Sequence, residues 1–93
     1  MYLRLVNFNL GSGQRPAADA LAKDLVPLIK SQPGCASANC FGDDADGQYG
    51  LVVLWDTQAH ADAASAVVGP RLQHHLAGKV TTPAAIRLFQ VIG

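Results

Sequence analysis

Residues 47–75, GQYGLVVLWDTQAHADAASAVVGPRLQHH, decide the fold because the hydrophobic period changes within them. In the first part apolar residues alternate with others. This predicts a strand over Gln48–Trp55 with one face formed by Tyr49, Leu51, Val53 and Trp55. Asp56 and Thr57 follow, and both residue types favour the N-cap of a helix. The period then lengthens to about 3.6 residues, which predicts a helix with an inner stripe of Ala61, Ala64, Ser65 and Val68.

The pair Gly69-Pro70 predicts that this helix breaks and that a second, short helix begins at Pro70. His74 and His75 both lie in the second helix. An imidazole can exchange a proton near neutral pH, and its neutral form can ligate iron. The helical wheel places His75 nearer the apolar face and His74 nearer the polar one. The alternative is a solvated helix end, where histidine complements the helix dipole.

The remaining segments supply partners for this strand and helix. Residues 2–10, 35–41 and 85–92 alternate as strands do, and residues 16–29 carry an apolar stripe with the helical period. The turn-forming residues Asp43 to Gly47 predict a hairpin between the second and third strands. The resulting order is β-α-β-β-α-β. We therefore expect one α+β domain over residues 1–93, with a ferredoxin-like, four-stranded antiparallel sheet and both helices on one face.

Asparagines on the first strand indicate a binding pocket. Asn7 and Asn9 alternate with Leu3 and Leu5, and we expect this face to lie against the helices. A buried amide without a partner costs about 1–3 kcal/mol. We therefore expect Asn7 and Asn9, joined by Asn39 from the second strand, to form the polar end of a pocket. The alternative is that the strand end simply emerges into solvent.

The opposite face of the sheet is expected to remain uncovered by helices, yet it would be strongly apolar. An exposed patch of this extent exceeds what a soluble monomer usually tolerates. We therefore expect a homodimer that packs two sheets face to face about a two-fold axis. We place Arg4 and Arg87 on this face, together with the apolar residues Val6, Phe8, Leu10, Val52, Leu54, Phe89 and Val91.

Composition excludes several classes of function. The 93 residues include seven basic and seven acidic side chains, so no net field attracts nucleic acid or an anionic membrane surface. No apolar run approaches the roughly 18 residues of a membrane span, and the first residues lack a signal-peptide pattern, so we expect a cytoplasmic protein. Cys35 and Cys40 are spaced unlike a zinc motif, and we interpret them as free thiols with no metal bound.

Four segments together resemble the antibiotic biosynthesis monooxygenase (ABM) family of dimeric α/β-barrel proteins. They are the first strand, the Pro33-Gly34-Cys35 turn, the strand and helix start GLVVLWDTQAHADA, and the terminal RLFQVI. The resemblance implies a ferredoxin-like fold and a dimer. Some family members oxidise polycyclic phenols or quinols with molecular oxygen and no cofactor. Others bind and open haem, and many have no established reaction.

The resemblance also implies site residues. Asn7 matches the asparagine of the haem group, His74 matches its haem-ligating histidine, and Ala64 stands where that group has a tryptophan. Trp55 matches the strand-ending tryptophan. Our leading hypothesis is a monooxygenase of a small aromatic substrate, with His74 or His75 as base and Asn7 as oxyanion donor. Asn9, Asn39, Trp55 and Ala64 would contact the substrate. The alternatives are a haem-binding or haem-degrading relative, and a non-catalytic dimeric ligand-binding module.

Overall fold

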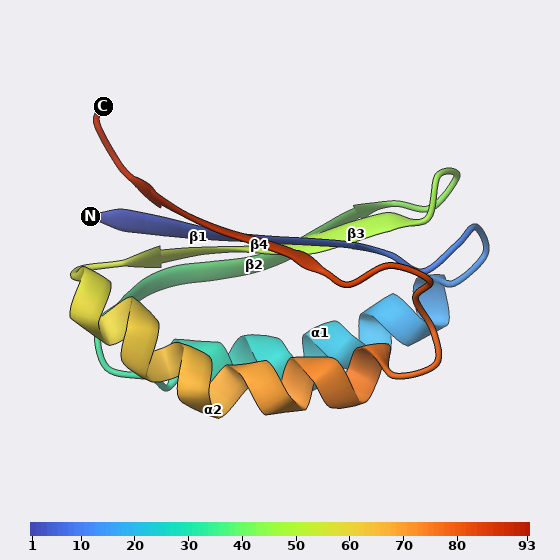
Figure 1. Cartoon of the computed structure of the whole chain (residues 1–93), viewed down its shortest axis with the longest axis horizontal. Helices are drawn as coiled ribbons and strands as arrows, with labels where there is room; N and C mark the ends of the chain where they lie inside the picture. The colour runs from blue at the N-terminus through green and yellow to red at the C-terminus, as the bar shows by residue number, and fades with distance from the viewer.

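The computed structural model describes all 93 residues and has two layers, a sheet and a pair of helices (Figure 1). The elements in chain order are β1 (Tyr2–Asn9), α1 (Arg15–Lys30), β2 (Cys35–Asp43), β3 (Gln48–Trp55), α2 (Gln58–Leu76) and β4 (Ala85–Gln90). The strands form one antiparallel sheet in the order β2-β3-β1-β4. Both helices cover the same face of it. The expected ferredoxin-like β-α-β-β-α-β fold is confirmed.

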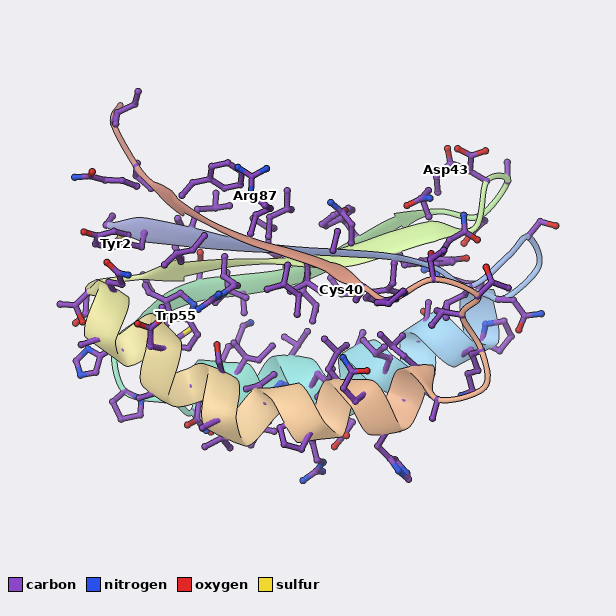
Figure 2. All side chains as sticks on the ribbon, viewed as in Figure 1. Tyr2, Cys40, Asp43, Trp55 and Arg87 are labelled. Atoms are coloured by element: carbon purple, nitrogen blue, oxygen red, sulfur yellow. The ribbon has the colours of Figure 1, made fainter.

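Helix α1 packs an apolar stripe against the sheet. Its residues Ala18, Leu21, Leu25 and Ile29 are buried, and Leu25 has no exposed surface. Their spacing of three or four residues puts them on one helical stripe. Figure 2 shows side chains from both layers meeting between the sheet and the helices. The core of the molecule lies in this space.

Helix α2 is one continuous helix, so the predicted break at Gly69-Pro70 and the separate short helix are wrong. A residue before proline is disfavoured in helical conformation because its Cβ meets the proline ring. Gly69 has no Cβ and avoids this clash. Pro70 also leaves the carbonyl of Ala66 without its helical hydrogen bond, but both residues are exposed, so water can bond that carbonyl. The predicted N-cap of α2 is confirmed, since the Thr57 hydroxyl accepts a hydrogen bond from the His60 N–H at 3.1 Å.

Strand β1 turns the opposite way from our expectation. Val6, Phe8 and Leu10 are buried under the helices, with 6%, 4% and 8% of their surface exposed. Strand alternation places Asn7 and Asn9 on the open face of the sheet. Both faces of β1 carry apolar residues, so the alternation alone does not reveal which face meets the helices. The larger side chains fill the core, and the asparagines avoid the cost of burial.

Of the other residues that we predicted on the open face of the sheet, some lie there and one does not. Val52 pairs with Leu5, and Leu54 pairs with Leu3, so both lie on the open face as expected. Phe89 also pairs with Leu3 and lies there. Figure 2 shows Arg87 on that side. The prediction that Arg4 lies on the open face is wrong, because Arg4 lies with Val6 on the side of β1 that faces the helices.

The β2–β3 connection is the predicted hairpin. Asp43 Oδ1 accepts a hydrogen bond from the Ala45 N–H at 3.0 Å. The Asp43 side chain therefore stabilises the turn that it begins. Gly47 has a φ of +76°, a conformation that favours glycine. Neither α1 nor α2 combines the length and apolar character that a membrane span requires.

Candidate functional site

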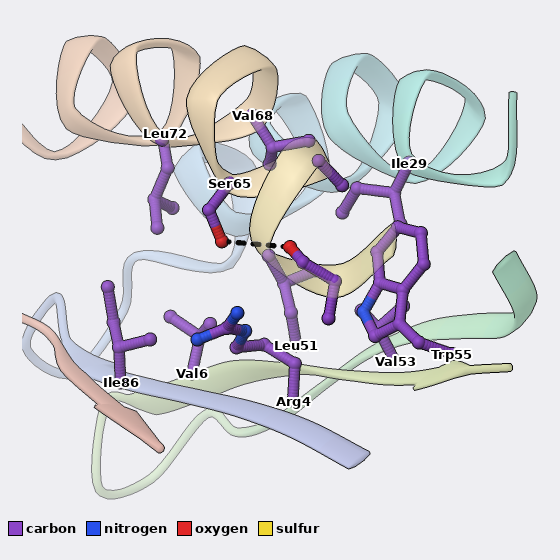
Figure 3. A pocket seen from close by; sticks show the side chains of 13 residues that line it. Arg4, Val6, Ile29, Leu51, Val53, Trp55, Ser65, Val68, Leu72 and Ile86 are labelled. Carbon is purple, nitrogen blue, oxygen red and sulfur yellow. Dashed lines mark hydrogen bonds between the residues drawn. The ribbon is translucent and has the colours of Figure 1, made fainter. Parts of the chain in front are cut away.

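A pocket of about 170 Å³ lies between the sheet and α2, along the stretch from Ala61 to Leu72 (Figure 3). It exists because α2 presents small residues here, whereas α1 presents large ones. Ten of its thirteen lining residues are hydrophobic. The sheet contributes Arg4, Val6, Leu51, Val53, Trp55 and Ile86, and the helices contribute Ile29, Ala61, Ala64, Ser65, Val68, Gly69 and Leu72.

Trp55 carries the most informative polar atom of the pocket. Its side chain is only 3% exposed, and its Nε1 atom is buried without a hydrogen-bond partner. Figure 3 shows the indole nitrogen turned toward the interior of the pocket. Most buried donors are paired in folded proteins, and an unpaired one costs about 1–3 kcal/mol. A ligand that carries an acceptor would satisfy this N–H group, and because the nitrogen itself has almost no exposed surface, the side chains around the indole must shift to admit that acceptor.

Arg4 and Ser65 supply the other polar groups. The Arg4 side chain is 18% exposed, and its Nη2 atom lies 3.5 Å from Oδ1 of Asp62, whose side chain is 62% exposed. The Ser65 hydroxyl donates to the carbonyl of Ala61 at 3.1 Å (Figure 3), which leaves the hydroxyl oxygen free to accept a hydrogen bond. Arg4 is the only charged residue among the thirteen that line the pocket.

Two of the predicted contact residues, Trp55 and Ala64, line this pocket. The three asparagines do not. Asn7 lies on the far side of the sheet, and Asn39 pairs with Val52 on that same side. Asn9 is used locally, because its Nδ2 donates to the Asp46 carbonyl at 3.3 Å and its Oδ1 accepts from the Gly11 N–H at 2.7 Å. The expected polar end of the pocket at Asn7 and Asn9 is therefore wrong.

The two adjacent histidines also lie outside the pocket lining. His74 is exposed. His75 is half-buried, and its Nε2 atom lies 2.8 Å from Oδ2 of Asp24 on α1. Arg71 contacts the same carboxylate, so Asp24 joins α1 to α2. Hydrogen bonds first from Arg71 and then from His75 lower the pKa of Asp24. The structure does not bring either histidine to Asn7, and their catalytic role stays a prediction.

Arg4 is the functional candidate that the sequence analysis placed on the wrong face. The sequence contains the information needed to find Arg4, because the strand alternation puts it on the same face as Val6, Phe8 and Leu10. Charged residues are rarely buried on such a face without a partner. Once that face is known to meet the helices, a single arginine within it marks a site.

The pocket lining does not fit haem. The iron of haem is held in proteins by histidine, cysteine, methionine or tyrosine, and none of these lines the pocket. No group of three or more histidine, cysteine or acidic side chains in the chain could hold a metal ion.

The sequence matches no protein-family model and no curated protein. Solved structures with the same fold are nevertheless numerous. A protein of Nitrosomonas europaea, provisionally named an antibiotic biosynthesis monooxygenase, has a TM-score of 0.84 at 14% identity over the whole of both chains. A provisionally named antibiotic biosynthesis monooxygenase of Deinococcus radiodurans also has a TM-score of 0.84, at 14% identity, over 100% of this chain and 94% of that one.

A variant of SnoaB from Streptomyces nogalater, described as a cofactor-independent oxygenase, is also similar. It has a TM-score of 0.75 at 18% identity over 97% of this chain and 92% of that one. Another similar structure, from Nitrosomonas europaea, is described as a protein of unknown function. At these identities the similarity establishes that the chain has the fold of the ABM proteins.

Proposed function

We propose that this chain is an ABM-type monooxygenase that oxidises a small aromatic phenol or quinol with molecular oxygen and without a cofactor. The observation that carries the proposal is the unpartnered N–H of Trp55 in an apolar pocket. The shared fold with SnoaB, described as a cofactor-independent oxygenase, supports it.

In this reaction the substrate supplies the electrons. A phenolate or quinol anion transfers one electron to O₂, and the resulting radical pair combines to form a carbon–oxygen bond. Loss of water from the ring hydroperoxide leaves a carbonyl, so a hydroquinone plus O₂ gives a hydroxyquinone plus water. The protein must exclude bulk water and stabilise charge on the substrate oxygens. The hydrophobic lining and the Trp55 N–H offer these two functions.

The pocket contains no group suited to act as a general base, because its lining has no carboxylate and no imidazole. His74, His75 and Asn7 therefore have no part in the proposed reaction. The substrate would lose its proton to solvent before or during entry. Arg4 lies in the lining and would favour the ionised form, since a nearby cation lowers the pKa of an acid.

We also propose that the protein is a homodimer, joined through the open face of the sheet. Leu3, Leu5, Val52 and Leu54 are half-buried there, and Phe41 and Phe89 are 42% and 39% exposed. A second copy of the same sheet would cover this face. The pocket lies on the other side of the sheet and would remain accessible.

Oxygen consumption in the presence of hydroquinone or an anthrone-like phenol tests the function. Trp55→Phe keeps an aromatic ring but removes the N–H, and we expect the rate to fall about 100-fold, as for loss of one oxyanion donor. Tyr49→Phe is the matched control, because the Tyr49 hydroxyl donates to Asp44 outside the pocket.

A second pair of variants tests whether the pocket itself is the site. Ala64→Leu would fill the space beneath α2 and abolish oxygen uptake. Ala63→Leu adds the same side chain at an exposed position of α2 and should have no effect. Oxygen uptake that survives both Trp55→Phe and Ala64→Leu would contradict the proposed site.

A further inference from the structure

The pocket beneath α2 contains one charged side chain, and its charge is positive. Arg4 is mostly shielded from water, and its one ion-pair partner, Asp62, lies at 3.5 Å with a side chain that is 62% exposed. A shielded charge is stable only if other groups replace its lost hydration. Asp62 does this weakly, because exposed ion pairs contribute little. An anion inside the pocket would compensate for the lost hydration of Arg4 more fully than Asp62 does.

The volume of the pocket indicates how much of that anion it can enclose. A cavity of about 150 Å³ lined by apolar side chains holds benzene, and this pocket measures about 170 Å³. One aromatic ring fits such a space. The polycyclic phenols suggested by the family resemblance are larger.

The polar groups of the pocket indicate where the ligand carries oxygen. The Arg4 guanidinium lies on the β1 side, and the indole nitrogen of Trp55 lies on the β3 side (Figure 3). Both groups donate hydrogen bonds and neither can accept one. A matching ligand therefore has an acceptor at two separate positions, one of them charged.

We propose that this pocket binds a single-ring aromatic oxyanion, either a phenolate or an aromatic carboxylate. Arg4 holds the charged oxygen, and the Trp55 N–H donates to a second oxygen on the ring. This inference rests on the proposed function and narrows its substrate class. It makes Arg4 the residue that determines specificity for an anion.

The single tryptophan of the chain provides a direct probe. Its indole N–H gives one signal in a ¹H–¹⁵N spectrum, and a hydrogen bond to a ligand shifts that signal. We would titrate 4-hydroxybenzoate, its neutral analogue 4-hydroxybenzyl alcohol, and the three-ring 9-anthracenecarboxylate. We expect the hydroxybenzoate to shift the indole signal and to bind about ten- to a hundredfold more tightly than the alcohol, as a charge-assisted hydrogen bond provides. The three-ring acid should not bind.

Variants at and near Arg4 separate its charge from its bulk. Arg4→Met should remove the preference for the anion, and Arg4→Lys should retain part of it. Arg15→Met is the control, because Arg15 is exposed and pairs with Asp19 and Asp44 away from the pocket. Asp62→Asn should act in the opposite direction and tighten anion binding by up to about fivefold, since it removes a competing carboxylate.

Hydroquinone distinguishes the two sources of the oxyanion. A phenol ionises near pH 10, so its binding should strengthen as the pH rises toward that value if the phenolate is the ligand. Carboxylate binding should not change over this range. Equal affinity for 4-hydroxybenzoate and its neutral analogue, binding that is unaffected by Arg4→Met, or no shift of the indole signal would overturn the proposal. Charge-dependent binding without oxygen uptake would uphold it and contradict the oxygenase function.

Discussion

At the scale of single residues, Asp24 is the clearest source of pH dependence. It receives hydrogen bonds from Arg71 and His75, and both lower its pKa in the folded protein. A carboxyl group with a lowered folded-state pKa stabilises the protein above its unfolded pKa of about 3.9. This stabilisation is lost as the pH falls through the folded value.

We therefore expect Asp24→Asn to lower the melting temperature at pH 7 and to reduce its further decline between pH 5 and pH 3. Some decline should remain, because hydrogen bonds from Tyr49 and His60 also lower the pKa values of Asp44 and Asp56. Calorimetry across this pH range would measure both effects. Asp46→Asn, a change in the exposed hairpin turn, serves as the control. A decline as steep in Asp24→Asn as in the unmodified protein would show that Asp24 does not contribute.

The residues of the candidate site differ in how well the sequence predicts them. Trp55 and Ala64 could be predicted because a strand face and a helix stripe follow from hydrophobic period alone. Asn7 and Arg4 each lie on the opposite face from the predicted one. The prediction failed because β1 is apolar on both faces, and assigning the strand to the other face reverses every side chain. The unpaired Trp55 N–H could not be predicted, since it depends on which atoms surround the indole in three dimensions.

At the scale of elements, Gly69 and Pro70 act as a coupled pair within α2. A glycine inside a helix normally costs up to about 1 kcal/mol relative to alanine. Here, however, an alanine Cβ at position 69 would meet the ring of Pro70. Apart from the adjacent residues and the nearby backbone of α2 itself, no atom lies within 4 Å of the site such a Cβ would occupy. The sequence predicts a helix end because each residue alone disfavours helix, whereas together they permit it.

We expect Gly69→Ala to stabilise the protein by about 1 kcal/mol in the Pro70→Ala background and to give little or no gain when Pro70 is present. Urea denaturation of the four proteins forms a double-mutant cycle that measures this coupling. Effects that add within about 0.5 kcal/mol would show that the two residues act independently, and that the helix tolerates Pro70 for another reason.

At the scale of the whole molecule, the order of elements could be predicted because each has a distinct hydrophobic period and its own turn or cap residues. Asp43 to Gly47 fixed the hairpin, and Thr57 fixed the start of α2. The two-layer arrangement then follows from the connection rules. Which face of the sheet the helices cover depends on how well side chains fill the core, and this is a property of the packed structure.

The open face of the sheet gives the prediction for the molecule as a whole. Leu5 and Val52 are paired neighbours near its centre, and Arg87 lies 4.7 Å from the Phe89 ring at the β4 edge. An apolar centre with a charged side chain at its edge is typical of an interface between copies. We expect the protein to sediment as a dimer at micromolar concentration.

A charge at the centre of this face should separate the copies, because burying an unpaired carboxylate is costly. We expect Leu5→Glu to sediment as a monomer, whereas Ala63→Glu, at an exposed position of α2, should remain dimeric. The pocket lies on the opposite side of the sheet, so a folded Leu5→Glu monomer should still shift the Trp55 indole signal with 4-hydroxybenzoate. A monomeric unmodified protein would contradict the dimer, and loss of the ligand shift only on dissociation would mean that the pocket depends on the second copy.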